Sequence, residues 1–423
     1  MAQQRWRRII PVALVMYTIA YVDRTNVSLA LDPSISSMMG DLGMNDRLKG
    51  EAAGIFFLGY MLLQIPSGYW ATRWSARKLV GLCLLGWGLC AVGCGLVQSF
   101  RQFEFMRFLL GVAESGVFPA TLVLLANWFP RAERARANAY WTLCQLVAIA
   151  GTAPLTGWLI GAYGWRTMLM LEGALPFLWL PLWCFGVRDH PSQAAWLDPA
   201  EREYLETQLR KDAEQLASPP NHGGGTQTAL PTGKAAAAIG VLIAMYFLQN
   251  CQAYGCMTFF TTMLKGRGFT AAEYGFLFAI PYAFAAAPML LNSAHSDRTQ
   301  ERRGHVAAVY LVSGLSLILA VCVRGNFWLS YVLLCFAIPG PFAAMGPFWA
   351  IPGEILPGAR MGAAIGLVNA FGNVGGFVGP SIVGYLKQEY QNLTVPFSVL
   401  GIGMVLAAGL AFLLPRPVAP STS

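Results

Sequence analysis

The chain has 423 residues, of which 56% are hydrophobic and only 12% are charged. Soluble domains carry about 25% charged residues, and a soluble surface cannot hide this much apolar side chain. The composition therefore excludes an ordinary soluble enzyme, a disordered protein and a nucleic-acid-binding module, and it predicts a polytopic membrane protein. The formal net charge of +8 has to be interpreted from the positions of the charges.

Apolar runs long enough to cross a bilayer recur along the whole chain. A hydrocarbon core of about 30 Å needs about 20 residues of helix. Twelve stretches meet this length, at residues 9–31, 51–71, 79–98, 102–126, 139–162, 167–187, 235–262, 273–294, 306–323, 327–351, 362–386 and 394–415. They are far longer than the strands of a membrane barrel. We therefore predict an all-α membrane protein with twelve transmembrane helices.

The positions of lysine and arginine predict how these helices are oriented. If the N-terminus lies inside, 19 of the 29 basic residues fall in inner segments and 8 in outer segments. The two remaining ones, Arg24 and Arg107, lie within spans. Basic residues are enriched in cytoplasmic loops. We therefore expect both termini to be cytoplasmic, and the net charge of +8 to reflect membrane topology.

The one long polar stretch of the sequence divides the spans six and six. It covers residues 188–234, and it contains a charged helical run from Asp198 to Gln215 followed by a Pro- and Gly-rich segment. Such a segment is typical of a flexible linker. We expect an N-terminal six-helix bundle at residues 1–187, a cytoplasmic linker loop at 188–234 and a C-terminal six-helix bundle at 235–423.

The two halves also repeat sequence patterns. The basic run after the second span, which includes Arg73 and Arg77, matches the run after the eighth span, which includes Asp297 and Arg298. Six plus six spans, a parallel repeat and a central inner loop resemble the major facilitator superfamily. The resemblance implies two pseudo-symmetric bundles, a substrate site between them at mid-membrane, and alternating access. Because Thr72 replaces an aspartate of the family's loop motif, we expect the inner gate to depend more on the second copy.

Four charged side chains lie inside predicted spans and away from their ends, namely Asp23 and Arg24 in the first and Arg107 and Glu114 in the fourth. A charge in a span costs at least about 2.5–3.5 kcal/mol, so it marks a pathway or a coupling site. Arg107 and Glu114 are two helical turns apart and share one face. Their depths would let Asp23 pair with Arg107 across the helices. Static ion pairs that fix helix packing are the alternative interpretation.

The types of these residues favour proton coupling to an anion. A carboxyl group in a low-dielectric site holds a proton more readily, whereas arginine keeps its charge and presents a planar fork to carboxylates. All four histidines fall in inner loops, which leaves Asp23 and Glu114 as proton carriers, and Na⁺ coupling is the less favoured option. Glu104 and Glu172 lie near outer ends of spans, where we expect them to reach water.

Several motifs resemble the anion:cation symporter family within this superfamily. That family takes up organic anions such as sugar acids, tartrate and phthalate, generally with H⁺ in bacteria. Leu171-Glu172-Gly173 resembles the tartrate, phthalate and hydroxy-aromatic acid branch. The motifs are Tyr21-Val-Asp23-Arg24-Thr-Asn26, Gly59-Tyr60-x3-Gln64-Ile-Pro66, Arg107-x6-Glu114-Ser-Gly-x-Phe118-Pro119, Trp128-Phe-Pro, Phe348-Trp349-Ala-x-Pro352 and Gly366-x2-Asn369-x3-Asn373.

The resemblance assigns roles to individual positions. Arg24 would bind the substrate carboxylate, Asp23 and Glu114 would be protonated, and Arg107 would tune one of them. The residues that would line the central cavity are Tyr21, Tyr60, Gln145, Trp349 and Asn369. Buried amides need hydrogen-bond partners, which agrees with a cavity role for Gln145 and Asn369. Aromatic residues in spans also serve in packing and at the membrane interface, and this role stays open for Tyr60 and Trp349.

We therefore predict a proton-coupled secondary transporter in a bacterial inner membrane. It would import a small organic anion such as a sugar acid, a tartrate-like hydroxy acid or an aromatic carboxylate. The expected partners are this anion, H⁺ and the lipid bilayer, with no nucleic acid, metal or cofactor and no enzymatic reaction, and a monomer suffices. The alternatives are an exporter of metabolites or drugs on the same fold, and a transporter-like sensor.

Overall fold

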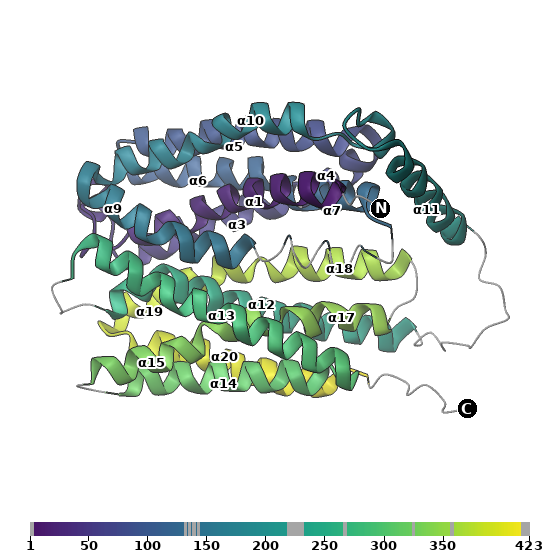
Figure 1. The fold of residues 1–423 in the computed structure, drawn as a ribbon. Coiled ribbons are helices and arrows are strands. Elements are labelled where there is room, and N and C mark those ends of the chain that lie inside the picture. Colours follow the sequence, from purple (N-terminus) through teal and green to yellow (C-terminus); the bar gives the residue numbers. More distant parts are fainter. Residues whose placement is uncertain are drawn as a thin grey trace.

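The computed structural model describes residues 4–130, 133, 137, 141, 144–217, 232–264, 269–323, 326–355 and 359–415. No strand occurs among these residues, and nearly all of them are helical. The long helices run side by side through the molecule (Figure 1). Of the expected linker, residues 218–231 lie outside the described part of the chain.

The first half of the chain forms one bundle, in which the longest described element, α9, contains most of the fifth predicted span and the start of the sixth. The chain turns at Gly164 (φ 78°) within α9. Thr156 and Glu172 are consequently hydrogen-bonded although 16 residues separate them, a separation of about 24 Å along a straight helix. The elements of this half are α1 (Gln4–Ala30), α2 (Met38–Asp41), α3 (Asp46–Leu62), α4 (Gln64–Trp70), η1 (Ala71–Ser75), α5 (Ala76–Leu96), α6 (Phe100–Glu114), α7 (Val117–Trp128), α9 (Cys144–Gly173) and α10 (Leu175–Gly186).

The second half of the chain forms the other bundle, and several of its spans are interrupted near the middle at glycine or proline. Two elements of the linker, the short η2 (Pro191–Gln193) and the 19-residue helix α11 (Pro199–Ala217), precede it. Its own elements are α12 (Thr232–Met263), α13 (Ala271–Thr299), α14 (Arg303–Cys322), α15 (Phe327–Ala337), α16 (Pro339–Ala343), α17 (Met345–Ile355), α18 (Ala359–Gly372), α19 (Gly375–Tyr390), α20 (Thr394–Leu410) and η3 (Ala411–Leu413).

These elements confirm the predicted fold of 12 transmembrane helices. By length and composition, 8 described helical stretches can cross a membrane. Two of them, Asp46–Leu96 and Cys144–Gly186, each cover two predicted spans. The stretch α1 is not among the eight, although it is long enough, because it carries Asp23, Arg24 and a run of arginines at its start.

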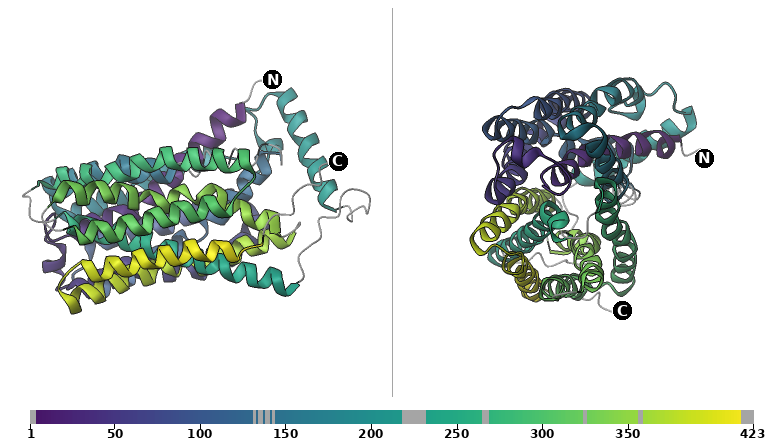
Figure 2. Two further views of the ribbon diagram at one scale, coloured as in Figure 1. Left: turned by 90° about the horizontal axis from the view of Figure 1, so that it is seen from below. Right: turned by 90° about the vertical axis from the view of Figure 1, so that its left-hand side faces the viewer.

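The two ends of the molecule are named here by the position of helix α11. The start of α1, the end of η3 and the helix α11 lie at the right in Figure 1, and we call this the α11 end. The other end is called the opposite end. Figure 2 views the molecule from two further directions and shows the two halves of the chain as adjacent bundles.

Helix α11 is attached to the first half of the chain. The buried Arg5 side chain binds Glu201 of α11 (2.5 Å) and Glu133 (2.7 Å). Trp128 and Trp196 stack at 5.3 Å between ring centroids, with their planes 5° apart. Because these contacts are buried, we expect α11 to follow the N-terminal bundle when that bundle moves.

The bundles meet closely at the opposite end. A Cβ atom on Gly50 of α3 would stand 2.2 Å from the carbonyl oxygen of Pro380 in α19, which leaves no room for a side chain. The α9–α13 contact is similar, since a Cβ on Gly157 would stand 2.4 Å from the Ala271 oxygen. Helix backbones in membranes approach this closely through small residues. The opposite end is therefore closed in this conformation.

Candidate functional site

The predicted Arg24 lies at the centre of the site and is caged by aromatic rings. Its guanidinium carbon is 4.7 Å from the Tyr21 ring, 5.1 Å from Phe56 and 4.8 Å from Tyr60. Its Nη2 atom donates a hydrogen bond to Glu114 Oε2 at 2.9 Å. The cage removes water from a permanent cation and leaves one carboxylate as its counter-ion, an arrangement in which breaking the pair is costly.

The Arg24–Glu114 pair keeps unused hydrogen-bonding capacity. Arg24 Nε and Glu114 Oε1 are both buried without a hydrogen-bond partner among the described residues. A guanidinium can engage a carboxylate through two parallel bonds. The site could therefore accept a second, external carboxylate at the free face of Arg24, or a proton at the free oxygen of Glu114.

The second pair of charges is arranged differently from our expectation. Asp23 and Arg107 do not pair through the carboxylate, because Arg107 Nη1 donates to the backbone carbonyl of Asp23 at 3.1 Å. The Asp23 carboxylate instead accepts hydrogen bonds from the Trp87 indole and, at 3.3 Å, from Asn26. The sequence spacing could estimate the depth of α1 and α6 but not the rotation of α1, which turns the Asp23 side chain toward α5.

Phe56 separates the two arginines and was not singled out by the sequence motifs. Its ring lies 5.1 Å from the guanidinium carbon of Arg24 and 5.1 Å from that of Arg107. Two cations on one aromatic ring are each stabilised by its quadrupole. The ring also lies between the two positive charges, of which Arg24 binds the Glu114 carboxylate and Arg107 binds the backbone carbonyl of Asp23.

Five further predicted residues lie around this centre. Tyr21 and Tyr60 are buried against Arg24, and Gln145 of α9 is also buried. Asn369 of α18 donates a hydrogen bond to Gln64 of α4 at 3.2 Å, which joins the two bundles. No hydrogen bond is seen for the Gln145 side chain within the described part of the chain, so it is available for another partner.

The second bundle contributes rings to the same region. Trp349 of α17 is half-buried and packs edge-on against Tyr246 of α12, with 5.1 Å between centroids. Tyr254, two turns further along α12, packs on Phe57 of α3 at 4.2 Å. These two tyrosines belong to the seventh predicted span, but their proximity to Arg24 depends on how α12 meets α1 and could not be deduced from the sequence.

A small cavity lies beside the two arginines, toward the opposite end. It is bounded by residues of both bundles, and the Arg24 and Arg107 side chains contribute to its wall. The lining residues are Arg24, Val27, Ser28, Ala53, Phe57, Arg107, Tyr254, Met257, Thr258 and Pro380. In this conformation the cavity has room for about one water molecule. Its two cations give the wall between the bundles a positive charge, which would attract an anion in a wider state of the same site.

A buried polar cluster closes the cavity at the opposite end, and we call it the polar seal. Lys49 of α3 and Asp32, just after α1, are fully buried with 3.8 Å between Nζ and Oδ2. Thr261 and Thr262 of α12 donate to Asp32 Oδ2 at 2.7 and 2.9 Å, and Lys49 Nζ donates to Thr262. The ion pair belongs to the first bundle and the hydroxyls to the second, so the seal connects them.

The predicted inner-gate residues lie at the α11 end, where the first loop motif finds a substitute for its missing acid. Asp189, after α10, accepts hydrogen bonds from the Ser75 hydroxyl (2.6 Å) and from the Arg77 backbone N–H (2.8 Å). The Arg73 guanidinium lies 5.2 Å from the Tyr69 ring. Asp189 thus provides the carboxylate that Thr72 cannot.

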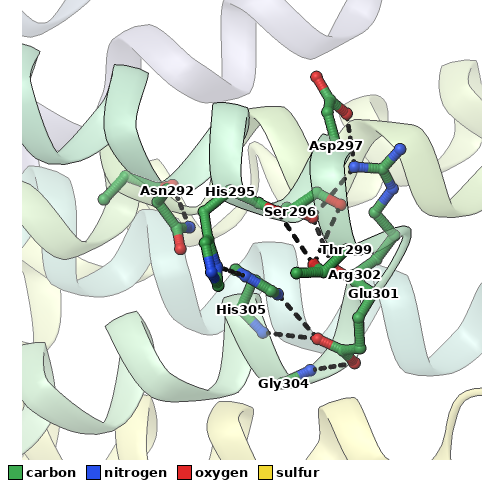
Figure 3. Close-up of polar contacts among 10 residues, drawn as sticks. Asn292, His295, Ser296, Asp297, Thr299, Glu301, Arg302, Gly304 and His305 are labelled. Carbon is green, nitrogen blue, oxygen red and sulfur yellow. Dashed lines mark hydrogen bonds and ion pairs between the residues drawn. The ribbon is translucent and has the colours of Figure 1, made fainter.

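The second loop motif keeps its acid, Asp297, which pairs with an arginine five residues further along the chain. Asp297 binds Arg302 at 2.5 Å (Figure 3). For Arg298, no ion pair occurs among the described residues. His295 and His305 contact each other at 2.6 Å, and His305 also contacts Glu301. Partial burial raises the pKa of Glu301, but hydrogen bonds from Gly304 and His305 outweigh this and hold that pKa below its usual value.

One expectation about a carboxyl group is wrong. Glu172 does not reach water, because its side chain is buried and accepts a hydrogen bond from Thr156 at 2.7 Å. Its position in the sequence suggested an outer helix end, but the chain turns at Gly164 and has run seven residues back into the bundle by Glu172, which is a depth of about 10 Å.

Comparison with known proteins gives a consistent assignment. The family model described as "Major Facilitator Superfamily" matches residues 13–380. A quinolone resistance transporter of Acinetobacter baumannii is 31% identical over 96% of this chain and 93% of its own. A putative tartrate transporter of Agrobacterium vitis is 32% identical over 97% of this chain and 90% of its own.

The fold is also that of solved transporters. The inward open conformation of the xylose transporter XylE from E. coli is 15% identical, with a TM-score of 0.74 over 98% of this chain and 97% of that one. The expected resemblance to transporters of organic acids is confirmed. The family model covers most of the chain, so the protein belongs to the Major Facilitator Superfamily and is a membrane transporter rather than an enzyme.

Proposed function

We propose that this protein is a proton-coupled symporter that imports a small organic anion by alternating access. The observation that carries the proposal is the Arg24–Glu114 pair inside its aromatic cage. The similarity to a putative tartrate transporter supports a carboxylate as substrate. We include sugar acids, tartrate-like hydroxy acids and aromatic carboxylates in the candidate class.

The pair couples a proton to an anion through competition for Arg24. While Glu114 is ionised it occupies the guanidinium, and an anionic substrate has to displace it. When Glu114 binds a proton, Arg24 loses its counter-ion, and a buried cation without a partner is costly. A substrate carboxylate then restores the balance. Protonation of Glu114 and anion binding to Arg24 therefore favour each other reciprocally.

Asp23 is the second proposed protonation site, and Arg107 tunes it. Its carboxylate is held by two neutral donors, Trp87 and Asn26, instead of by a cation. Arg107 lies close enough to bind the Asp23 backbone carbonyl. A proton on Asp23 would remove one negative charge from the neighbourhood of Arg24 and Arg107. The site would then attract an anion more strongly.

The remaining cavity residues would select the substrate. Tyr21 and Tyr60 lie at the cage, Gln145 has free hydrogen-bonding capacity, and Trp349 and Asn369 come from the second bundle. Hydroxyl, amide and ring contacts suit an acid that carries hydroxyl groups or an aromatic ring. When the bundles close on such a ligand, the residues of the first bundle and those of the second would contact it together.

The proposed transport cycle alternates between states that are open at the α11 end and states that are open at the opposite end. We propose that residues 1–187 and 235–423 rock against each other as bundles, with 188–234 as the linker. The α11 end would be cytoplasmic and the monomer sufficient for transport. Opening and closing at that end would involve the loop-motif residues Arg73, Arg77, Asp297 and Arg298.

The Glu114→Gln variant tests the proposal in proteoliposomes. Gln keeps the shape of the protonated acid but cannot release a proton. We expect it to lose accumulation driven by a pH gradient while it retains exchange of internal for external anion. Glu104→Gln, on the same helix, is the matched control and should accumulate as the wild type does. Normal accumulation by Glu114→Gln would contradict the proposed role.

Export is the second candidate function, because the quinolone resistance transporter is 31% identical. An exporter on the same fold would let protons enter down the same gradient while the substrate moves out. The two functions differ in the response of internal substrate to an inward proton gradient. Import raises internal anion above external, whereas export empties preloaded vesicles.

A further inference from the structure

Glu172 is a buried carboxyl group that the proposed coupling scheme does not use. Its side chain is 4% exposed. No lysine or arginine forms an ion pair with it in the described ranges, unlike Glu114, whose counter-ion is Arg24. An ionised carboxylate buried without a cation carries a large desolvation penalty. Burial without a cation therefore favours the neutral, proton-bearing form of this group in the present conformation.

The hydrogen bonds around Glu172 agree with a proton on one particular oxygen. Oε1 accepts the bond from Thr156 at 2.7 Å, whereas Oε2 is buried and has no hydrogen-bond partner among the described residues. A buried acceptor without a donor is unfavourable, but a carboxylic O–H at Oε2 is itself a donor. The Oδ1 atom of the neighbouring Asn26 is also buried without a donor.

Asn26 connects this carboxyl group to the coupling site. Its amide donates to Asp23 Oδ1 at 3.3 Å, and its side chain also interacts with Glu172. Asp23 is the titratable group that faces Glu172 from α1. From α5, the contact is apolar, because the adjacent Gly173 packs directly on the Ala91 backbone. A change of charge on Glu172 is therefore felt mainly at Asp23.

Glu172 also lies behind the closed opposite end. Its partner Thr156 is followed by Gly157, and it is at Gly157 that α9 contacts the Ala271 carbonyl oxygen of α13. Separation of the bundles at the opposite end would break this contact next to the Thr156–Glu172 pair. The carboxyl group would then meet water from that side and exchange its proton, while in the closed state it is shut off.

We propose that Glu172 is a third proton-binding group of the transport cycle, loaded from the opposite end when α9 and α13 separate. The step is a simple protonation, in which a carboxylate oxygen of Glu172 takes one proton from water and later returns it. The proposal rests on the proposed symport function and adds to it one proton carried for each anion. A purely structural Glu172 would keep its proton throughout the cycle.

The test measures proton flux and anion flux together in proteoliposomes, using tartrate and glucarate as probes. Glu172→Gln keeps the shape of the neutral acid and the bond from Thr156, so a structural role survives the change. We expect this variant to transport the anion with one proton fewer per anion than the wild type. Glu104→Gln is the matched control and should keep the wild-type ratio.

The outcomes distinguish a failure of the role of Glu172 from a failure of proton symport itself. A wild-type ratio in Glu172→Gln overturns the role of Glu172 and leaves proton symport intact. Anion transport by the wild type without any proton flux overturns both. Thr156→Val is the second variant, for the case in which Glu172→Gln does not fold. It removes the hydrogen bond from Thr156 to the carboxyl group and keeps the acid. We expect it to shift the pH dependence of uptake, and an unchanged pH profile contradicts the proposal.

Discussion

Removing the cation of the polar seal should open the molecule at the opposite end. In Lys49→Met the fully buried Asp32 keeps its hydrogen bonds from Thr261 and Thr262 but loses its counter-ion. At 3.8 Å the attraction between the two charges is about 4 kcal/mol for an effective dielectric constant of 20. Leaving one member of a buried pair alone costs about 3–5 kcal/mol. Asp32 avoids this cost by returning to water when the bundles separate.

The expected change is therefore a large shift in population. A cost of about 3 kcal/mol moves the equilibrium roughly a hundredfold toward the state that is open at the opposite end. Replacing both charges, as in Asp32→Asn with Lys49→Met, removes the unpaired charge and should reverse most of this shift. Arg47→Met is the surface control, because the Arg47–Glu51 pair is exposed and such pairs contribute at most about 1 kcal/mol.

The assay is the reactivity of a cysteine placed at Ser28, which lines the cavity behind the seal. The nine native cysteines are replaced first, and a membrane-impermeant maleimide is added on the side of the opposite end. We expect much faster labelling in Lys49→Met, and near-normal labelling in the double variant and in Arg47→Met. Equal labelling in all four proteins would refute the assigned role of the seal.

Three further changes test other parts of the structure. Trp87→Phe removes the indole donor of the buried Asp23, so stability in detergent should fall by about 1–3 kcal/mol, and an unchanged melting curve would contradict this. Gly50→Val places atoms against an α19 carbonyl and should abolish uptake, whereas Gly40→Ala, which meets no neighbour, should not. Arg24→Lys keeps the charge but loses the planar fork, so uptake should fall about tenfold or more, and normal transport kinetics would count against the cage.

The spans were predictable because each apolar run is long enough to cross a bilayer and because the polar linker separates them. Their interruptions were not. The break between α18 and α19 and that between α6 and α7 occur at glycines that also serve close helix packing, so the same residues are compatible with a continuous helix. Helix α11 was expected as a charged run, but its attachment through Arg5 depends on a contact 196 residues away in the sequence.

The charged residues of the site were also predictable, since few charges occur within apolar runs. Their partners were not, because partner choice depends on helix rotation and on side-chain conformation. Arg24 binds Glu114, and Arg107 binds only the backbone of Asp23. Lys49 precedes the second predicted span and belongs by position to the outer basic residues, yet it is fully buried. An error of a few residues in a span boundary is enough to move such a side chain from water into the interior.

The most direct test of the central claim follows protons in wild-type proteoliposomes that contain a pH-sensitive dye and no sodium. A panel of organic acids, tartrate and aromatic carboxylates among them, is added outside at equal pH on both sides. The account predicts that at least one acid acidifies the interior, and that Arg24→Ala abolishes this signal. Anion uptake by the wild type without acidification, or acidification that persists in Arg24→Ala, would contradict it.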